Sequence, residues 1–217
     1  MLEIYTEDRR NRLGCLALPL EVAHAQEVSA YLGFGGVYDK SNGTKIDTFS
    51  DGNLDQKPAL NGPFAELGMS VLIGKQWGVG AEITRRLAQG NYAGINYSPS
   101  FSSLDAIYIA ARISSKRIEP EFRLGIGAAR VHYYFDDPDS CGRVLGCPVS
   151  THFQARFSIT DRIYFSNHFY ARPAFALHYV NNFTDFGSNW VPEYSLGIGF
   201  SLGRGKPRPH ASTNTSN

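Results

Sequence analysis

The segment that most constrains the fold is the last apolar stretch of the chain, from Trp190 to Leu202. Its residues alternate between two classes, reading W-V-P-E-Y-S-L-G-I-G-F-S-L. As a strand, it would carry large apolar side chains on one face and mainly glycine and serine, with the carboxylate of Glu193, on the other. A soluble sandwich would show ordinary surface residues on that second face. Glycine and serine instead suit the crowded interior of a small closed barrel whose apolar face is turned into lipid.

The same alternation recurs along the chain and predicts eight strands. The expected segments are residues 27–38, 63–73, 77–84, 104–113, 118–135, a sixth beginning at 151, 169–180 and 190–202. The sixth could turn at 160–162 or at 166–168, and the second is favoured because the first makes the next strand improbably long. Connections alternate long and short, as in an up-and-down barrel with long outer loops and tight periplasmic turns. The expected fold is all-β: an eight-stranded antiparallel up-and-down transmembrane β-barrel.

Three local features of these segments are also predicted. Residues 39–62 and 86–103 are polar and are expected to be long exposed loops. In the fourth segment, Ile107 and Ile109 are assigned to the outward face. The phase of the fifth segment slips near Ala128-Ala129, which indicates a bulge.

Composition agrees with strands and excludes other classes. The chain has 217 residues, among them 22 Gly, 12 Tyr and 14 Phe, a mixture that favours strands and tight turns. The formal net charge of +1 gives no reason to expect a nucleic-acid partner. No apolar run approaches the ~18 residues that a membrane helix needs, so a membrane form would span as a barrel.

The two ends of the chain differ from the rest. Arg9, Arg10 and Arg12 precede a short apolar run and then Ala23-His24-Ala25, the order of a secretory signal. We therefore expect residues 1–25 to be a signal peptide, residues 26–202 the barrel and residues 203–217 a disordered polar tail. Acidic residues near the start weaken the signal, and a frayed N-terminal helix of a soluble protein is the alternative.

Charged residues inside the expected strands fall on the face of small side chains. They are expected to pair with one another in the barrel lumen, because buried charges are tolerated when guanidinium and carboxylate meet. The expected lumen network is Glu66, Glu82, Arg112, Glu121, Arg123, Arg156, Arg172, His178 and Glu193. The alternative is a set of surface charges on ordinary amphipathic strands, which predicts scattered parity and more lysine. We expect no metal site and no cofactor.

Cys141 and Cys147 bracket a turn-rich stretch. A local disulfide between them is expected in an oxidising compartment. A pair with this spacing is weak evidence for a metal, since two further ligands would be needed nearby.

Four segments carry a family resemblance: residues 30–36 (A-Y-L-G-F-G-G), 121–129 (E-F-R-L-G-I-G-A-A), 168–179 (H-F-Y-A-R-P-A-F-A-L-H-Y) and 194–200 (Y-S-L-G-I-G-F). With them the chain resembles the small outer-membrane β-barrels of Gram-negative bacteria, the family of the OmpA transmembrane domain and OmpX-like proteins. The resemblance implies a location in the cell outer membrane, insertion by the barrel-insertion machinery, and contact with outer-membrane lipid and lipopolysaccharide. A monomer is expected.

Three functions follow from these observations. The first is a structural or interaction barrel with a charge-plugged lumen and ligand- or partner-contacting outer loops, without enzyme activity. The second is an outer-membrane lipid-modifying enzyme, for which His132, His152 and His178 are candidates, although no G-x-S-x-G motif occurs. The third is a soluble lipocalin-like carrier, which would reverse the inward and outward faces.

Overall fold

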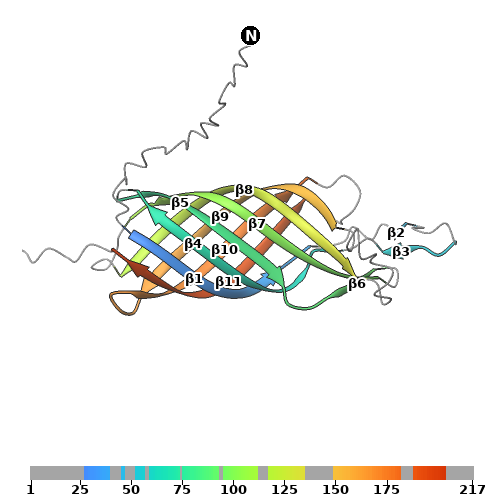
Figure 1. Ribbon diagram of the computed structural model, residues 1–217, viewed down its shortest axis with the longest axis horizontal. Coiled ribbons are helices and arrows are strands. Elements are labelled where there is room, and N and C mark those ends of the chain that lie inside the picture. Colours follow the sequence, from blue (N-terminus) through green and yellow to red (C-terminus); the bar gives the residue numbers. More distant parts are fainter. Residues whose placement is uncertain are drawn as a thin grey trace, which may run out of the picture.

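The computed structural model describes residues 27–39, 45–46, 52–56, 59–73, 75–92, 95–111, 117–134, 149–181 and 188–203. Within these residues, eight long strands form a barrel: β1 (Glu27–Val37), β4 (Gly62–Leu72), β5 (Trp77–Arg86), β7 (Ile95–Ile109), β8 (Ile118–Tyr134), β9 (Val149–Tyr164), β10 (Phe169–Val180) and β11 (Trp190–Leu202). Three short strands lie beyond one end of it: β2 (Lys45–Ile46), β3 (Asp55–Gln56) and β6 (Gly90–Tyr92) (Figure 1). No described helix has the length and apolar character to cross a bilayer. The prediction of an all-β, eight-stranded antiparallel barrel is confirmed.

The barrel is closed by backbone pairing all the way round. Each long strand pairs with its neighbour in the chain, β11 returns to β1, and β5 pairs directly with β7. When the register is followed from Val28 once around the barrel, it returns to β1 at Tyr38, ten residues further on. Because this offset is an even number of residues, inward residues pair with inward residues all the way round the barrel. An offset of this size tilts the strands by about 40° to the axis.

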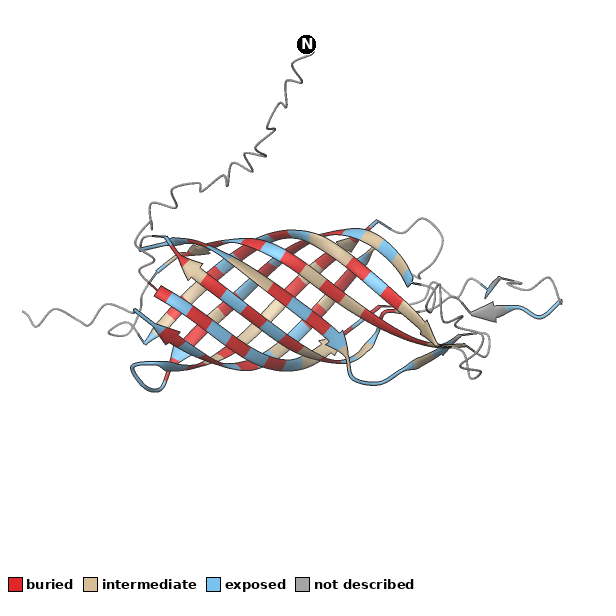
Figure 2. Ribbon diagram, in the orientation of Figure 1, coloured by how far each residue is buried: buried red, intermediate tan, exposed pale blue. Residues whose placement is uncertain are grey.

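Inward and outward residues alternate along every long strand, giving the checkerboard of burial in Figure 2. On β11, for example, Leu196 and Ile198 are exposed while Gly197 and Gly199 are buried. The large exposed side chains of the barrel wall are mostly apolar, whereas most charged side chains of the strands are buried. This is the reverse of a soluble barrel and is the pattern of a lipid-facing one.

The two ends of the barrel differ. We call the end where β1 begins and β11 ends the turn end, and the opposite end, which carries β2, β3 and β6, the loop end (Figure 1). Turn-end connections include the four-residue turn from Phe165 to His168, where the backbone N–H of Phe165 and of Ser166 donates to the Phe169 carbonyl. The favoured prediction for the end of the sixth strand is therefore confirmed.

The expected loop at 86–103 is wrong. Residues 90–92 form β6, and residues 95–103 form the first part of β7, so the strand begins nine residues earlier than predicted. The serines of this part lie outside the apolar belt, so they do not show the apolar alternation that was used to find strands. Pro99 is accommodated because the β5–β7 pairing ends at Ser100, leaving no ladder bond on that side for Pro99 to miss.

The predicted faces of the fourth segment are also wrong. Ile107 and Ile109 point inward and are buried with Leu72 in a small apolar cluster at the turn end. Ala106 and Tyr108 face outward. Both faces of the segment are apolar at this end, so alternation over 104–113 alone could not fix its phase.

The predicted bulge near Ala128-Ala129 is absent from β8. The register of β8 with β7 and with β9 runs without interruption through both alanines. The apparent slip has another cause: the interior becomes apolar towards the loop end, so that inward Ala129 and Val131 are buried while outward Arg130 is exposed.

Several predictions lie outside the described residues. They are the signal peptide at 1–25, the tail beyond Gly203, the pair Cys141 and Cys147, and Arg112 of the expected lumen network.

Candidate functional site: the charged lumen

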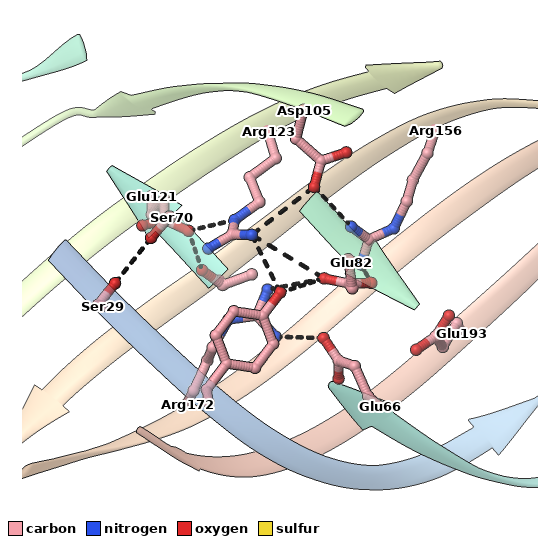
Figure 3. Close-up of polar contacts among 12 residues, drawn as sticks. Ser29, Glu66, Ser70, Glu82, Asp105, Glu121, Arg123, Arg156, Arg172 and Glu193 are labelled. Atoms are coloured by element: carbon pink, nitrogen blue, oxygen red, sulfur yellow. Dashed lines mark hydrogen bonds and ion pairs between the residues drawn. The ribbon is translucent and has the colours of Figure 1, made fainter. Parts of the chain in front are cut away.

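Charged side chains fill the middle of the barrel. Eight of the nine residues expected there are described, and all eight are buried: Glu66, Glu82, Glu121, Arg123, Arg156, Arg172, His178 and Glu193. They come from six of the eight barrel strands and converge because each occupies an inward position. Figure 3 shows how the acidic and basic groups face one another across the lumen.

Tyr31 is at the centre of this network. Its ring lies 3.9 Å from the guanidinium carbon of Arg172 and 5.2 Å from that of Arg123, measured to the ring centroid. Its hydroxyl donates to Glu82 and accepts a 3.0 Å hydrogen bond from Arg123 Nη1. Both guanidiniums therefore lie close to the ring, which is favourable in a desolvated interior.

Arg172 and Arg156 bridge the carboxylates of neighbouring strands. Arg172 Nη1 donates to Glu66 Oε1 at 2.5 Å, and its Nη2 donates to Glu82 Oε2 at 3.5 Å. Arg156 Nη2 is 2.6 Å from Glu82 Oε1, and Arg156 Nη1 lies 3.4 Å from Asp105 Oδ2. Arg123 Nη1 is also 4.0 Å from Glu82 Oε2, so three guanidiniums surround Glu82 and offset much of the cost of burying its charge.

Three charged members of the network, Asp105, Arg162 and Glu27, were not predicted from the sequence. Asp105 lies 3.6 Å from Arg123 Nη1, and Arg162 is paired with Glu121 and, at 2.8 Å, with Glu27. Asp105 was missed because the phase of its strand was inverted. Arg162 was missed because it was considered as part of a possible turn, although it continues the inward parity of Arg156.

His178 forms a separate part of the network. Its Nε2 is 2.8 Å from Glu193 Oε2, its Nδ1 is 3.2 Å from Gln154 Oε1, and its ring packs on Phe101 with centroids 4.7 Å apart. Three residues therefore hold the imidazole in place, which is consistent with a structural role for His178 in the lumen.

Glu66, Glu82 and Glu193 are the one described group of carboxylates close enough to share an ion, with one oxygen of each within 4.8 Å of the others. However, Arg172 contacts the first two and His178 the third. Protein side chains therefore already contact all three carboxylates, and the cluster is best described as part of the lumen network.

A buried apolar cluster, which we call the plug, lies in the lumen at the loop end. It contains Val37, Leu60, Phe64, Tyr97, Phe101, Ala129, Val131, Val180 and Val191. Leu60 belongs to the connection between β3 and β4, yet its side chain is fully buried. Its backbone N–H donates to Asp39 Oδ2 at 2.8 Å, and the Tyr97 hydroxyl contacts both the N–H and the carbonyl of Ala59. A loop segment is thus folded back into the barrel mouth and held there.

Asp39 lies beyond the end of β1 and is buried by this segment. Burial raises the pKa of the Asp39 carboxyl, and the hydrogen bond from the Leu60 N–H only partly opposes that shift.

The histidines considered for an enzyme have different settings. His178 is buried in the lumen and His132 is half-buried on β8. His152, at the loop end of β9, has its Nε2 2.7 Å from Ser150 Oγ and its Nδ1 3.2 Å from the carbonyl oxygen of Asn181. The structure thus gives His152 a serine partner two residues away on the same strand, a contact that spacing did not suggest.

The exterior forms an apolar belt with an aromatic residue near each edge. Leu104 in the middle is 70% exposed, as are Ile126 and Ile198 to a similar degree. The chain's two tryptophans face outward at opposite ends: Trp77 begins β5 at the turn end and Trp190 begins β11 at the loop end. Transmembrane barrels place aromatic girdles at both interfaces. A lipocalin-like carrier is excluded, because its apolar face would line the lumen.

No protein-family model and no curated protein sequence matches this chain. Among solved structures, it is similar to Ail, the attachment invasion locus protein of Yersinia pestis, in a complex with the heparin analogue sucrose octasulfate. The identity is 15%, the alignment covers 81% of this chain and 98% of Ail, and the TM-score is 0.50. It is also similar to Neisserial surface protein A (NspA), at 11% identity over 80% of this chain and 95% of NspA, with a TM-score of 0.53. The chain therefore has the fold of the small eight-stranded outer-membrane β-barrels.

Proposed function

We propose that this chain is a non-catalytic outer-membrane protein whose sealed barrel is a scaffold that presents its loop-end segments to ligands or partners outside the cell. The observation that carries the proposal is the stacked and ion-paired group of Arg172, Tyr31, Arg123 and Glu82, which ties four strands together across the lumen. The plug around Leu60 adds a second barrier at the loop end. An eight-stranded barrel has room only for its own side chains, so its function is located outside the lumen.

The location supports the same proposal. An apolar belt flanked by tryptophans calls for a bilayer, and a transmembrane β-barrel is the form that outer membranes contain. Residues 1–25 would direct export, Cys141 and Cys147 would form a disulfide in the oxidising periplasm, and the closing strand 190–202 would be read by the insertion machinery. The solved relatives include a surface protein and an attachment protein, which agrees with a loop-based role.

The orientation can be tested in intact cells. Leu54, between β2 and β3 at the loop end, and Phe165, in a turn at the opposite end, are both well exposed. Leu54→Cys should react with a membrane-impermeant maleimide added outside, whereas Phe165→Cys should react only after lysis, with the wild-type protein as background. Labelling of Phe165→Cys alone in intact cells would contradict the proposed orientation.

The sealed lumen is tested by conductance. The purified protein in planar bilayers is expected to give no stable current steps. Regular open-channel steps from the wild-type barrel would overturn the scaffold proposal in favour of a pore.

A second candidate is a hydrolase at the loop-end rim, favoured by one observation: Ser150 Oγ lies 2.7 Å from His152 Nε2, with a carbonyl behind Nδ1. A donor bond from Nδ1 to that carbonyl would leave Nε2 free to take the serine proton. A fluorophosphonate probe decides between the candidates. Labelling of the wild type but not of Ser150→Ala would establish the hydrolase, and no labelling would leave the scaffold.

A further inference from the structure

The plug is completed by a residue from outside the barrel strands. Residues 59–61, which we call the strap, precede β4 and lie outside the ladder. The strap contributes Leu60, whose side chain is fully buried, whereas Asn61 next to it is exposed. The other members of the plug come from β1, β4, β7, β8, β10 and β11. Six strands of the barrel mouth therefore surround one leucine side chain with apolar groups, and we call this surround the Leu60 site.

Polar side chains at the Leu60 site bind the backbone of the strap. The Tyr97 hydroxyl accepts a 3.1 Å hydrogen bond from the Ala59 N–H and donates at 2.8 Å to the Ala59 carbonyl. Asp39 Oδ2 accepts from the Leu60 N–H at 2.8 Å. The site thus pairs with three backbone groups of two consecutive residues and surrounds the side chain of the second. This combination suits a peptide with an aliphatic side chain, because an aliphatic group without a peptide bond would leave Asp39 and Tyr97 unpaired.

Two features favour opening of the strap. It joins β4 at Gly62, whose φ of 141° lies in the region that favours glycine, so the chain can pivot there. The closed strap also leaves buried polar atoms unpaired, because Asp39 Oδ1 and Arg86 Nε and Nη1 have no hydrogen-bond partner among the described residues. Arg86 Nε lies against the pivot, since a Cβ on Gly62 would come within 2.6 Å of it. Unpaired buried groups are costly, and opening would expose them to water.

We propose that the Leu60 site binds an aliphatic side chain on a peptide segment of a partner protein, and that the strap occupies the site until the partner displaces it. The proposal rests on the role proposed above for the loop end, and it adds the chemistry of the partner. The strap is a competitor built into the chain, so it is present at a high effective concentration. The apparent affinity of the partner is therefore set by the fraction of molecules whose strap is open.

The first experiment compares two variants of the strap. Leu60→Asp places a carboxylate where the structure has a buried aliphatic side chain, and so favours the open strap. Asn61→Asp is the matched control, because it adds the same charge at an exposed position of the strap. Both variants and the wild type are folded in neutral detergent micelles and titrated with N-acetyl-alanyl-leucine amide. This peptide reproduces Ala59 and Leu60 of the strap.

Binding is followed by NMR at the backbone amides of Val180 and Val191 in the plug, with Phe165 at the turn end as the internal reference. Leu60→Asp should bind the leucine peptide saturably and at least about tenfold more tightly than the wild type or Asn61→Asp. N-acetyl-alanyl-alanine amide and isoamyl alcohol should each bind Leu60→Asp at least about tenfold more weakly. Equal binding of the alanine peptide would overturn the aliphatic site, and equal binding of the alcohol would overturn peptide recognition. No saturable shift with any probe would overturn the site altogether.

Hydrogen exchange of the wild type tests the opening of the strap without any variant. The Leu60 N–H, which donates to Asp39, should exchange at least about tenfold faster than the amides of the ladder between β1 and β4. A Leu60 N–H that exchanged as slowly as the ladder would contradict the opening. Neither experiment depends on the orientation or the conductance of the barrel, so failure here is distinct from failure of the scaffold proposal.

Discussion

The guanidinium carbon of Arg172 lies 3.9 Å from the centroid of the Tyr31 ring, and the guanidinium carbon of Arg123 lies 5.2 Å from the same centroid. The three residues belong to β1, β10 and β8, strands that are far apart in the chain. The contact therefore connects distant parts of the wall through the lumen. The Tyr31 contacts use both its ring and its hydroxyl, and substitutions can remove the hydroxyl alone or the whole side chain.

Tyr31→Phe removes the hydroxyl that donates to Glu82 and accepts from Arg123, and should reduce the free energy of unfolding by about 1–3 kcal/mol. Tyr31→Ala also removes the ring and should cost more, about 3–5 kcal/mol. Urea titration in lipid vesicles, followed by tryptophan fluorescence, measures both. An alanine variant as stable as the wild type would show that the ring is not structural.

The Arg172–Glu66 ion pair should behave as a coupled unit. Arg172→Met leaves Glu66 buried without its cation and should cost about 3–5 kcal/mol. Adding Glu66→Gln should recover part of that loss, giving a coupling energy of at least about 1 kcal/mol in a double-mutant cycle. Arg117→Met, at an exposed turn position, is the control and should be nearly neutral. Strict additivity of the two lumen changes would contradict the pairing.

Gly68 is required by the ring of Tyr31. A Cβ at Gly68 would overlap that ring, whereas a Cβ at Gly36 would have the Gly62 carbonyl oxygen, 3.9 Å away, as its nearest neighbour. Gly68→Ala should therefore destabilise the barrel by about 1–3 kcal/mol, and Gly36→Ala should be tolerated. The same urea titration compares them. Equal effects of the two substitutions would argue against close packing of Tyr31 on β4.

The lipid belt makes a prediction that a soluble barrel would not share. Leu104→Arg places a guanidinium in the middle of the belt and should cost about 2–4 kcal/mol in vesicles. Leu87→Arg, at a 61% exposed position just after the end of β5 at the loop end, should cost no more than about 1 kcal/mol. If both substitutions were neutral, the exterior at Leu104 would be in water.

Asp39 should make stability depend on pH. Because its pKa is raised in the folded protein, the folded state holds the proton more tightly than the unfolded chain does. This contribution is fully present below the ordinary pKa of about 4 and is lost as the pH rises through the raised value. The stability of Asp39→Asn relative to the wild type should therefore increase between pH 4 and pH 7, while the amide oxygen still accepts from Leu60. A constant difference across that range would show that Asp39 titrates normally.

Much of this fold could be predicted from the sequence because lipid and lumen impose opposite demands on alternate residues. On β11 and β4 the two faces differ so strongly that both phase and extent follow from the pattern. The pattern fails where that contrast fades. Ser98 and Ser100 lie beyond the belt, and Ile107 lies at an end of the lumen that is itself apolar.

The sequence predicted which residues belong to the lumen network better than it predicted which of them pair with each other. Parity alone placed Glu82 and Arg172 on the inner face, but which carboxylate meets which guanidinium depends on register and on strand tilt. The contacts of Tyr31 with two guanidiniums depend on the closure of the barrel, because they join β1 to β8 and β10. The contact of Ser150 with His152 depends on rotamers, which no spacing rule supplies.

The lipid-facing exterior is tested most directly with the two native tryptophans, Trp77 and Trp190, which face outward at opposite ends of the belt. The protein is reconstituted in vesicles of lipids brominated at defined depths along the acyl chain. A lipid-facing exterior predicts strong quenching of tryptophan fluorescence, greatest for bromine nearest the headgroup, and little quenching by aqueous iodide. Efficient quenching by iodide with none by brominated lipid would contradict a lipid-facing exterior.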